Sequence, residues 1–331
     1  MPTPSGGLLD QHNRQHNYLR ISVTDRCSLR CTYCMPAEGI DWKPRQALLN
    51  YEEIIRLAKV FVELGVNKIR LTGGEPSLRH NLHTLIEQLA LLPNQTMLAM
   101  TTNGLLLPQT AKLFKAHGLT SLNISLDTLK ADRFKAITQF NALGQVLDGI
   151  DAAIEAGYWP LKINMVVMAG INEDEIMDFV DFVKDKPLNV RFIEFMPFKN
   201  NQWGLERFVP YNAVRQQIET RYALQPIRTE PHAVAKDFAI EGHTGTVSFI
   251  TSMSQSFCST CNRIRLTADG AIKSCLFDPA EVSLRDAMRC GASDEELKQL
   301  IRQTLWNKSE GHAPAEEILA HQNRPMIAIG G

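Results

Sequence analysis

The amino-acid sequence predicts an α/β protein of repeated β-α units, followed by a smaller and less regular C-terminal lobe. Two observations lead to this prediction. The spacing of hydrophobic residues switches between two and 3.6 along the first two thirds of the chain, as it does when strands alternate with helices. After about residue 200 this alternation becomes irregular. We therefore expect one unit at 1–200 and a second at 201–331.

Six short apolar segments of the first unit have the length and composition of strands. They lie at 19–23, 68–71, 97–101, 122–126, 162–167 and 190–195. Between them, Asn50 and Glu53 form a capping box at the start of a helix that Gly65 ends. Asn172 and Glu175 are expected to cap a later helix. Six such units form either an open sheet or a partial barrel, and their number alone does not decide between the two.

In both arrangements the carboxyl ends of the strands face one site, and polar residues stand at those ends. They include 72–75, 101–103, Ser125 with Asp127, and Arg191 with Glu194. The sequence therefore places its functional residues at this end of the strands.

The C-terminal lobe is expected to contain a helix at 211–221 and strands at 246–250, 263–267 and 271–275. Asp269 and Gly270 form a strong two-residue hairpin signal between the last two strands. Such a turn would bring Cys275 opposite Ile264.

Composition is that of an ordinary soluble globular protein, with 44% hydrophobic and 21% charged residues among 331. The net charge of −1 argues against a general nucleic-acid binder. No apolar run reaches membrane-spanning length, and the polar segment 11–17 is unlike a secretory signal, so we expect a cytoplasmic protein without membrane contact. Seven cysteines, an odd number, then suggest metal ligation or catalysis rather than disulfides.

Cys27, Cys31 and Cys34 form the first of two cysteine triplets, on the loop after the first strand. Three thiolates in eight residues can hold three irons of a 4Fe-4S cluster and leave the fourth iron open. The alternatives are a zinc loop with a fourth ligand from elsewhere, or three unrelated buried cysteines.

Cys258, Cys261 and Cys275 form the second triplet, and only Cys290 stands outside both. The spacing fits a zinc site completed by another ligand or a second 4Fe-4S cluster with an open iron. Arg263 and Arg265 share one face of the adjoining strand. They indicate recognition of a polyanion, the alternative being a solvated strand face. The role of Cys290 stays open.

The first triplet, with its Cys-x3-Cys-x2-Cys spacing after a strand, resembles the radical S-adenosylmethionine (SAM) superfamily. The segment 72–76, Thr-Gly-Gly-Glu-Pro, resembles that family's motif for the SAM amino group. The resemblance implies a partial or complete β/α barrel, here a partial barrel of six units. It also implies that SAM chelates the open iron and yields a 5′-deoxyadenosyl radical.

The segments 20–27, 191–197 and 257–270, together with the terminal glycine pair, resemble the GTP 3′,8-cyclase family of molybdenum-cofactor biosynthesis. The resemblance implies a second 4Fe-4S cluster whose open iron meets the guanine of GTP. It implies hydrogen removal from the ribose C3′ and attack of that carbon on C8. The implied partners are GTP, an electron donor and the downstream cyclic pyranopterin monophosphate synthase, and a homodimer is possible.

Residue by residue, the resemblance assigns the two triplets to the two clusters. Its SAM-contacting positions match Tyr33, Gly74, Ser125 and Met196. Its GTP-binding positions match Arg20, Arg70, Thr101, Lys162, Arg263, Ile264 and Arg265, with Lys68 and Arg191 as further basic candidates. The tail residues Gly330 and Gly331 would reach the active site, where the family needs them for activity; the alternative is a frayed chain end.

Charge supports a triphosphate site independently of the resemblance. Five basic residues lie on or beside the predicted strands, where an unpaired cation costs desolvation: Arg20, Lys68, Arg70, Lys162 and Arg191. Two alternative functions remain. One is another radical SAM enzyme with an auxiliary cluster, such as a peptide-modifying enzyme, although those usually carry more cysteines in this region. The other is a zinc-stabilised nucleotide-binding protein without turnover.

Overall fold

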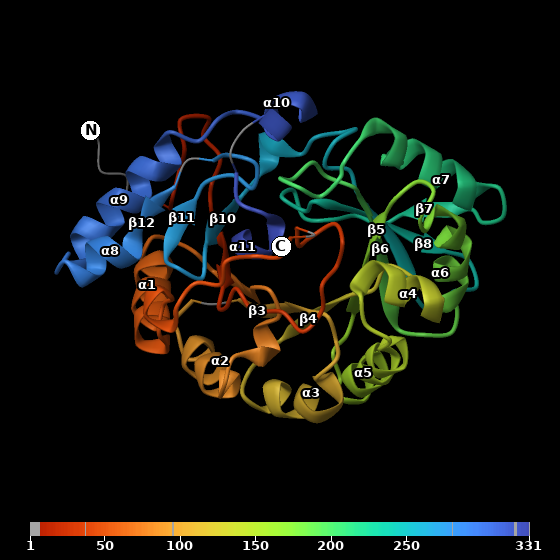
Figure 1. The fold of residues 1–331 in the computed structure, drawn as a ribbon, viewed down its shortest axis with the longest axis horizontal. Helices are drawn as coiled ribbons and strands as arrows, with labels where there is room; N and C mark the ends of the chain where they lie inside the picture. The colour runs from red at the N-terminus through yellow and green to blue at the C-terminus, as the bar shows by residue number, and fades with distance from the viewer. Residues whose placement is uncertain (1–6, 37, 95, 280, 321–322, 331) are drawn as a thin grey trace.

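A single twelve-stranded sheet curves around a central space in the computed structural model (Figure 1). The structure describes residues 7–36, 38–94, 96–279, 281–320 and 323–330. From one edge to the other the strand order is β12-β11-β10-β1-β2-β3-β4-β5-β6-β9-β8-β7. The strands contributed by the first half of the chain therefore occupy the middle of the sheet.

Six neighbouring parallel strands form the partial barrel that the resemblance implied. They are β1 (Tyr18–Ser22), β2 (Lys68–Thr72), β3 (Met97–Thr102), β4 (Ser121–Ser125), β5 (Leu161–Val167) and β6 (Leu188–Glu194). The helices between them cover the outside of the sheet (Figure 1): α1 (Tyr51–Glu63), α2 (Leu82–Ala90), α3 (Leu107–Ala116), α4 (Ala131–Thr138), α5 (Leu143–Glu155) and α6 (Ile176–Phe182). All six predicted strands are confirmed to within two residues at each end.

The main hydrophobic core lies between the strands and these outer helices. Leu19 and Ile21 of β1 and Phe61 of α1 are fully buried there. At the start of α1, the Asn50 side chain accepts a hydrogen bond from the Glu53 backbone, and Glu53 returns one to Asn50. The predicted capping box is thus present, and it fixes the helix that packs behind β1 and β2.

The C-terminal part of the chain adds three strands to each edge of the same sheet. On one edge β9 (Thr246–Ile250) runs parallel to β6, with β8 (Ala235–Ile240) and β7 (Leu224–Pro226) antiparallel beyond it. On the other, β10 (Arg263–Leu266) runs parallel to β1, with β11 (Ala271–Lys273) and β12 (Val282–Ser283) beyond it. The division at residue 200 stays a prediction.

The remaining helices are α7 (Tyr211–Glu219), α8 (Leu284–Arg289), α9 (Asp294–Trp306), α10 (Ala315–Ala320) and α11 (Met326–Ile329). α11 lies inside the arc of strands, not on its outer face (Figure 1). A second small core of Phe198, Phe277, Ile318 and Ile329 holds it there. Within the described residues, no helix combines the length and the apolar character needed to span a membrane.

Short 3₁₀ helices occur at Arg45–Ala47, Pro76–Leu78, Glu173–Glu175, Leu205–Arg207 and Cys258–Thr260. The last of them begins at Cys258 of the second triplet, and Cys261 directly follows it.

The predicted two-residue turn between β10 and β11 is wrong. Thr267 donates its backbone N–H to Ala271, so the loop contains the three residues 268–270, with Gly270 at a φ of +80°. A three-residue loop with glycine in this conformation is the next common hairpin type. Arg265 pairs with Lys273, which moves Cys275 from the level of Ile264 to that of Arg263.

The predicted cap by Asn172 and Glu175 is also wrong. The Asn172 amide instead bridges strand ends: it donates to the backbone carbonyls of Asp127 and Val166. Glu175 is fully buried. Its carboxylate accepts hydrogen bonds from the hydroxyl of Thr128 and from the backbone N–H of Leu129. The capping pattern matched by spacing alone, whereas the buried strand ends offered these side chains unpaired donors and acceptors.

Candidate active site

The carboxyl ends of the strands open into a cavity of about 350 Å³. Most of the predicted site residues line it: Arg20, Cys27, Cys31, Tyr33, Cys34, Arg70, Gly74, Thr101, Ser125, Arg191, Met196, Cys258, Cys261, Arg263, Arg265 and Cys275. Both cysteine triplets thus border the same space, although more than 200 residues separate them in the chain. All seven cysteines, including the exposed Cys290, are free thiols.

The loop that carries the first triplet is tied to neighbouring elements. The backbone N–H groups of Arg30 and Thr32 donate hydrogen bonds of 3.0 Å to backbone carbonyls at the end of α4. Arg30 donates to Thr138, and Thr32 donates to Ile137. The Sγ atom of Cys27 accepts a backbone hydrogen bond from Leu29 at 3.4 Å. These bonds hold the three thiols at the cavity wall without using their metal-binding capacity.

Burial, together with the neighbouring thiol of Cys27 and the carboxylate of Asp127, raises the pKa of Cys34 to about 12. The pKa of Cys31 is raised well above its usual value for the same reasons. Such thiols become thiolates when a cation offsets their charge, which is what ligation to iron provides.

Two glycines bring the loop after β2 against this cysteine loop. A Cβ atom on Gly74 would lie 2.2 Å from the carbonyl oxygen of Arg26, and one on Gly73 would lie 2.6 Å from that of Thr24. The Gly74 N–H donates to the Thr24 carbonyl at 2.9 Å. The glycine pair is therefore required by the close approach of two backbones.

Glu75, next in the chain, is buried and joins the ends of two strands. Its carboxylate accepts hydrogen bonds from the hydroxyl of Thr102 at 2.7 Å and from the backbone of Asn103 at 2.6 Å. The hydroxyl and the backbone N–H of Ser77 also donate hydrogen bonds to this carboxylate. The Asn103 amide then reaches Ser28 of the cysteine loop at 2.9 Å. Glu75 thereby aligns β3 with the loop of the first triplet.

Asp127 holds the ring of Tyr33 in place. The Tyr33 hydroxyl donates a 2.7 Å hydrogen bond to the Asp127 carboxylate. Asp127 follows β4 and also accepts from the backbone of Val166 at 2.9 Å. Burial raises the pKa of Asp127 to about 6, although these two hydrogen bonds oppose the rise. The ring of Tyr33 is thus fixed beside the first triplet.

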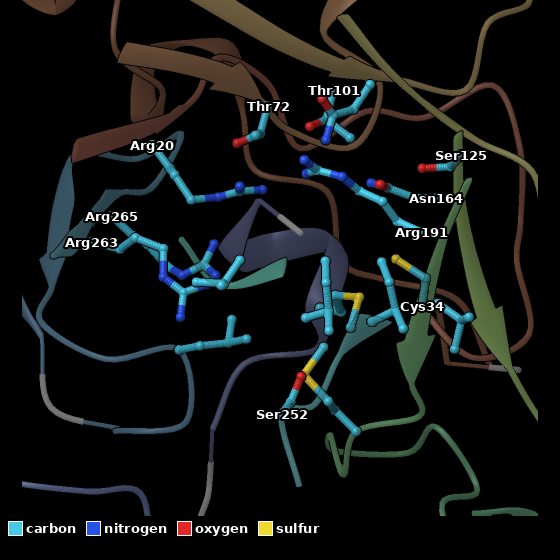
Figure 2. A pocket seen from close by; sticks show the side chains of 18 of the residues that line it. Arg20, Cys34, Thr72, Thr101, Ser125, Asn164, Arg191, Ser252, Arg263 and Arg265 are labelled. Carbon is cyan, nitrogen blue, oxygen red and sulfur yellow. The ribbon is translucent and has the colours of Figure 1, made fainter. Parts of the chain in front are cut away.

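Five arginines from β1, β2, β6 and β10 line the cavity and form an arginine cluster: Arg20, Arg70, Arg191, Arg263 and Arg265. Figure 2 shows all of them except Arg70 by label. Burial, together with the nearby guanidinium groups of Arg70 and Arg263, lowers the pKa of Arg20 to about 10. Arg191 is likewise lowered to a pKa of about 10 by burial and by Arg70. This accumulation of buried positive charge is unfavourable unless an anion enters.

Four predicted residues that the structure describes do not line the cavity: Lys68, Ile264, Lys162 and Gly330 of the tail. Lys68 opens β2 at the amino end of the strand, away from the site. Ile264 packs into the main core on the opposite face of β10 from Arg263 and Arg265. Burial, with the positive charges of Arg191 and Arg70, lowers the pKa of Lys162 to about 8. Lys162 shares one face of β5 with Asn164, which does line the cavity.

The second triplet lies among cations. Lys308 Nζ is 3.4 Å from the Sγ of Cys261, and an Nη atom of Arg263 is 3.9 Å from it. Burial would raise the pKa of Cys261, but these two cations outweigh it and bring the pKa down to about 6. The electrostatic setting therefore differs from that of the first triplet, where the nearby charges are the carboxylates of Asp127 and Glu75.

The C-terminal tail enters the arc of strands. The carbonyl of Gly330 accepts a 3.1 Å hydrogen bond from Arg265, and a Cβ on Gly330 would lie 2.7 Å from the Thr72 hydroxyl. As far as Gly330 the tail is buried, not frayed. Gly331, predicted with it, lies outside the described residues.

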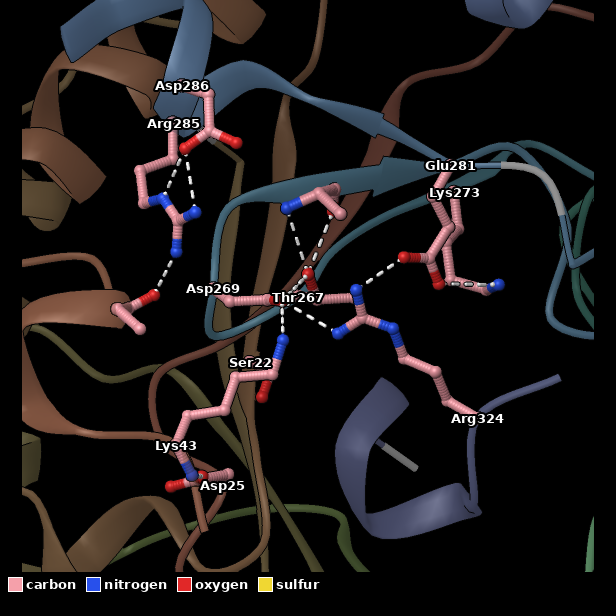
Figure 3. Close-up of polar contacts among 12 residues, drawn as sticks. Ser22, Asp25, Lys43, Thr267, Asp269, Lys273, Glu281, Arg285, Asp286 and Arg324 are labelled. Atoms are coloured by element: carbon pink, nitrogen blue, oxygen red, sulfur yellow. Dashed lines mark hydrogen bonds and ion pairs between the residues drawn. The ribbon is translucent and has the colours of Figure 1, made fainter. Parts of the chain in front are cut away.

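A group of charged residues anchors this tail, as Figure 3 shows. Arg324 donates to Asp269 at 2.8 Å and also pairs with Glu281. Lys43, from the segment after the first triplet, binds the same carboxylate of Asp269. Burial raises the pKa of Asp269, but Arg324 and Lys43 outweigh it and hold the pKa far below its usual value. The anchor therefore connects the tail, the β10–β11 loop and the first cysteine loop.

Comparison with known proteins identifies the family. The model of the Radical SAM superfamily matches residues 21–183, and that of Molybdenum Cofactor Synthesis C matches 188–314. A relative from Arabidopsis thaliana, "GTP 3',8-cyclase, mitochondrial", is 50% identical over 98% of this chain and 83% of its own length. The "GTP 3',8-cyclase" of Syntrophomonas wolfei is 44% identical over 98% of this chain and its full length. This chain belongs to the GTP 3′,8-cyclase family.

Animal members of the cyclase family, named "Molybdenum cofactor biosynthesis protein 1", also match, but the chain spans about half of their length. Among solved structures, Streptococcus suis SuiB bound to precursor peptide SuiA has a TM-score of 0.60 at 15% identity, over 96% of this chain and 76% of that one. That likeness concerns the fold and agrees with the partial barrel.

Membership of the GTP 3′,8-cyclase family confirms the predicted cofactors, 4Fe-4S clusters and SAM. The cavity fits them: two sets of three free thiols border it, and the glycine pair leaves its edge free of side chains. Among the described residues, the amide oxygens of Asn123 and Asn164 are buried in the cavity wall without a hydrogen-bond partner. A bound ligand with N–H or O–H groups would satisfy both.

Sequence reasoning missed several residues that this cyclase-family site brings together. Asn164 follows the alternation of β5 and was detectable as a polar residue on an inward strand position. Tyr18, Arg14 and Lys308 also line the cavity. Arg14 and Lys308 lie outside any strand and far from both triplets in sequence, so no periodic signal pointed to them.

Proposed function

We propose that this chain cyclises GTP to (8S)-3′,8-cyclo-7,8-dihydroguanosine 5′-triphosphate, the first step of molybdenum-cofactor biosynthesis. The observation that carries the proposal is the single cavity bordered by both cysteine triplets and by the arginine cluster. A nucleotide held between them would present its base to one triplet and its ribose toward the other. The reaction is the one named for its relatives in the GTP 3′,8-cyclase family.

On the side of the first triplet, Cys27, Cys31 and Cys34 would hold the radical-generating cluster. When bound, that cluster and SAM supply the carbon-centred radical that removes a hydrogen atom from the substrate. We assign the SAM contacts to Tyr33, Gly74, Ser125 and Met196, all at the cavity wall. Gly74 offers backbone to the ligand because no side chain fits there, and Asp127 fixes the ring of Tyr33.

On the other side, Cys258, Cys261 and Cys275 would hold the second cluster beside the base. A triphosphate would neutralise these buried cations, and guanidinium groups match its oxygens in bidentate fashion. We assign this role to Arg20, Arg70, Arg191, Arg263 and Arg265, with Thr101 hydrogen-bonded to Arg70 at 3.3 Å. Lys162 would contribute charge from the face of β5 that also carries Asn164, and Lys68 and Ile264 would act indirectly.

The tail would complete the site. Arg265 binds the Gly330 carbonyl and lines the cavity at the same time, so Gly330 would position that guanidinium for substrate. We assign Gly331 to the same role. An electron donor and the downstream cyclic pyranopterin monophosphate synthase are the proposed partners, and a homodimer is the proposed assembly. A cytoplasmic location stays a prediction from the sequence, and the name of the Arabidopsis relative includes the word mitochondrial.

Anaerobic iron and sulfide analysis tests the proposal, followed by incubation with SAM, dithionite and GTP. Wild type is compared with a variant carrying Cys258→Ala, Cys261→Ala and Cys275→Ala. We expect about eight irons in wild type and about four in the variant. Wild type should release 5′-deoxyadenosine and consume GTP. Zinc with about four irons, or SAM cleavage without loss of GTP, would contradict the proposal and indicate another radical SAM substrate.

A further inference from the structure

Lys308 is a buried cation beside the second triplet. It follows the end of α9, is 3% exposed, and lines the cavity. Its Nζ atom lies 3.4 Å from the Sγ of Cys261 and 3.3 Å from the carbonyl oxygen of Arg263. Among the described residues no carboxylate forms an ion pair with it. An ammonium in such a place is costly unless a negative charge compensates it.

The thiolates of Cys261 and Cys275 are the negative charges that favour the ammonium of Lys308. In the segment before β1, the carboxylate of Asp10 binds Arg14 at 2.6 Å and His16 at 2.9 Å. Arg14 then donates to the carbonyl of Cys258 at 2.9 Å and to those of Ser309 and Glu310. The segment before β1 therefore braces the loop of Lys308 and adds a second cation behind the triplet.

The first triplet has the opposite setting. Asp127 is the charged group that acts on Cys31 and Cys34. A cluster becomes more negative by one charge when it is reduced. Nearby cations and N–H donors to its sulfur atoms favour that state, whereas nearby anions disfavour it.

We propose that Lys308 raises the reduction potential of the second cluster by donating a hydrogen bond to the Cys261 sulfur. Lys308 is a positioning and tuning residue, not one that touches the reacting atoms. Together with Asp127 at the other triplet, it gives the two clusters different potentials, with the second cluster reduced first. The inference rests on a cluster at the second triplet, but not on GTP being the substrate.

A redox titration followed by electron paramagnetic resonance tests this in the full chain loaded with both clusters. The Cys258, Cys261 and Cys275 triple alanine variant assigns the signals to the two clusters. In Lys308→Met we expect the midpoint potential of the second cluster to become more negative, while that of the first stays unchanged. Lys308→Arg, which keeps the charge, should restore it. Lys298→Met is the control, since Lys298 on the preceding helix pairs with Glu63 and Glu295.

An unchanged second-cluster potential in Lys308→Met, at full iron content, would overturn the inference. If that variant does not load the second cluster, Lys308→Gln takes its place, because an amide keeps an N–H donor without the charge. Failure of both to load would assign Lys308 to cluster assembly and equally overturn the tuning role. The titration needs no GTP, so a two-cluster protein that leaves GTP intact would remove the proposed function and leave this test valid.

Discussion

At Gly74 two backbone segments approach so closely that the residue type is determined by space alone. The atom in the way, the carbonyl oxygen of Arg26, belongs to backbone and cannot rotate aside like a side chain. Because Arg26 directly precedes Cys27, any displacement at Gly74 is transmitted to the loop of the first triplet. One methyl group therefore acts on both stability and the SAM side of the cavity.

We expect Gly74→Ala to lower the free energy of unfolding by about 2 kcal/mol, as overpacking against rigid neighbours does. SAM binding by the cluster-loaded protein should weaken at least about tenfold, which corresponds to about 1.4 kcal/mol. Denaturant unfolding and equilibrium binding measure the two effects. Gly144→Ala in α5, where a Cβ meets nothing within 4 Å, is the control and should stabilise by about 0.5 kcal/mol. Equal behaviour of the two variants would contradict the argument.

We expect Lys162 to make GTP affinity depend on pH. With a pKa lowered to about 8 by burial and by its cationic neighbours, its ammonium is charged below pH 8 and neutral above it. A triphosphate binds the charged form better, so affinity is present at pH 7 and is lost as the pH rises through 8. We expect about a tenfold loss between pH 7 and pH 9. Lys162→Arg stays charged and should give a flatter profile in equilibrium binding.

Tyr18 supplies the check on this assignment, because its pKa is also near 8. Burial raises that pKa, and Arg70 and Arg20 lower it by more. A phenolate would repel the triphosphate and mimic the loss of charge at Lys162. Tyr18→Phe is therefore expected to keep the slope that Lys162→Arg removes, and the reverse result would assign the slope to Tyr18.

At the scale of elements, the tail depends on an anchor outside the cavity. α11 has only four residues, too few for a helix to be stable by itself. Its position comes from the small core around Phe277 and from the ion pairs of Arg324 with Asp269 and Glu281. The Asn323 amide adds hydrogen bonds to the carbonyls of Leu276 and Phe277. Charge and packing together hold Gly330 against Arg265.

Arg324→Ala is expected to release the tail while leaving both clusters in place. Loss of its charge-assisted hydrogen bonds costs about 1–3 kcal/mol, so amide hydrogen exchange at 323–330 should quicken by about tenfold or more. SAM cleavage should continue while less product forms for each 5′-deoxyadenosine released. Arg285→Ala is the control, since it removes an ion pair with Asp286 on α8 and a hydrogen bond to the Ala47 carbonyl but no contact of Arg324 (Figure 3). Unchanged exchange in Arg324→Ala would show that packing alone holds the tail.

At the scale of the whole molecule, the two parts of the chain share one sheet. β10 pairs with β1 and β9 pairs with β6, so both edges of the six-stranded barrel are covered by C-terminal strands. The second triplet enters the site because β10 lies next to the strand that leads into the first. Removing the C-terminal part would expose two parallel strand edges and one side of the cavity.

We therefore expect a fragment of residues 7–200 to lack cooperative unfolding. Circular dichroism in increasing urea should show a gradual loss of signal for the fragment and one sharp transition for the full chain. Sedimentation should find the fragment associated, because its open edges can pair with other copies. A monomeric fragment with a sharp transition would instead show that residue 200 ends an independent folding unit.

Local sequence patterns predicted the strands, a helix start and the chemistry of this protein. The period of hydrophobic residues located all six barrel strands, and the capping box at Asn50 is present as predicted. The two cysteine triplets and the glycine pair pointed to a radical SAM enzyme because their spacing is itself part of the site. Most of the predicted site residues do line one cavity. These features depend on neighbours in sequence, so sequence reasoning could find them.

Contacts between distant segments were decided only by the tertiary structure. Spacing suggested that Asn172 and Glu175 cap a helix, but buried strand ends bind them instead. Lys308 reaches Cys261 across 47 residues of chain, and Arg324 reaches Asp269 across 55. The partners of a buried charge are whatever groups packing leaves near it, and a sheet whose edges are closed by remote strands sets that packing. The sequence by itself thus determined which groups are available, and the fold determined which of them meet.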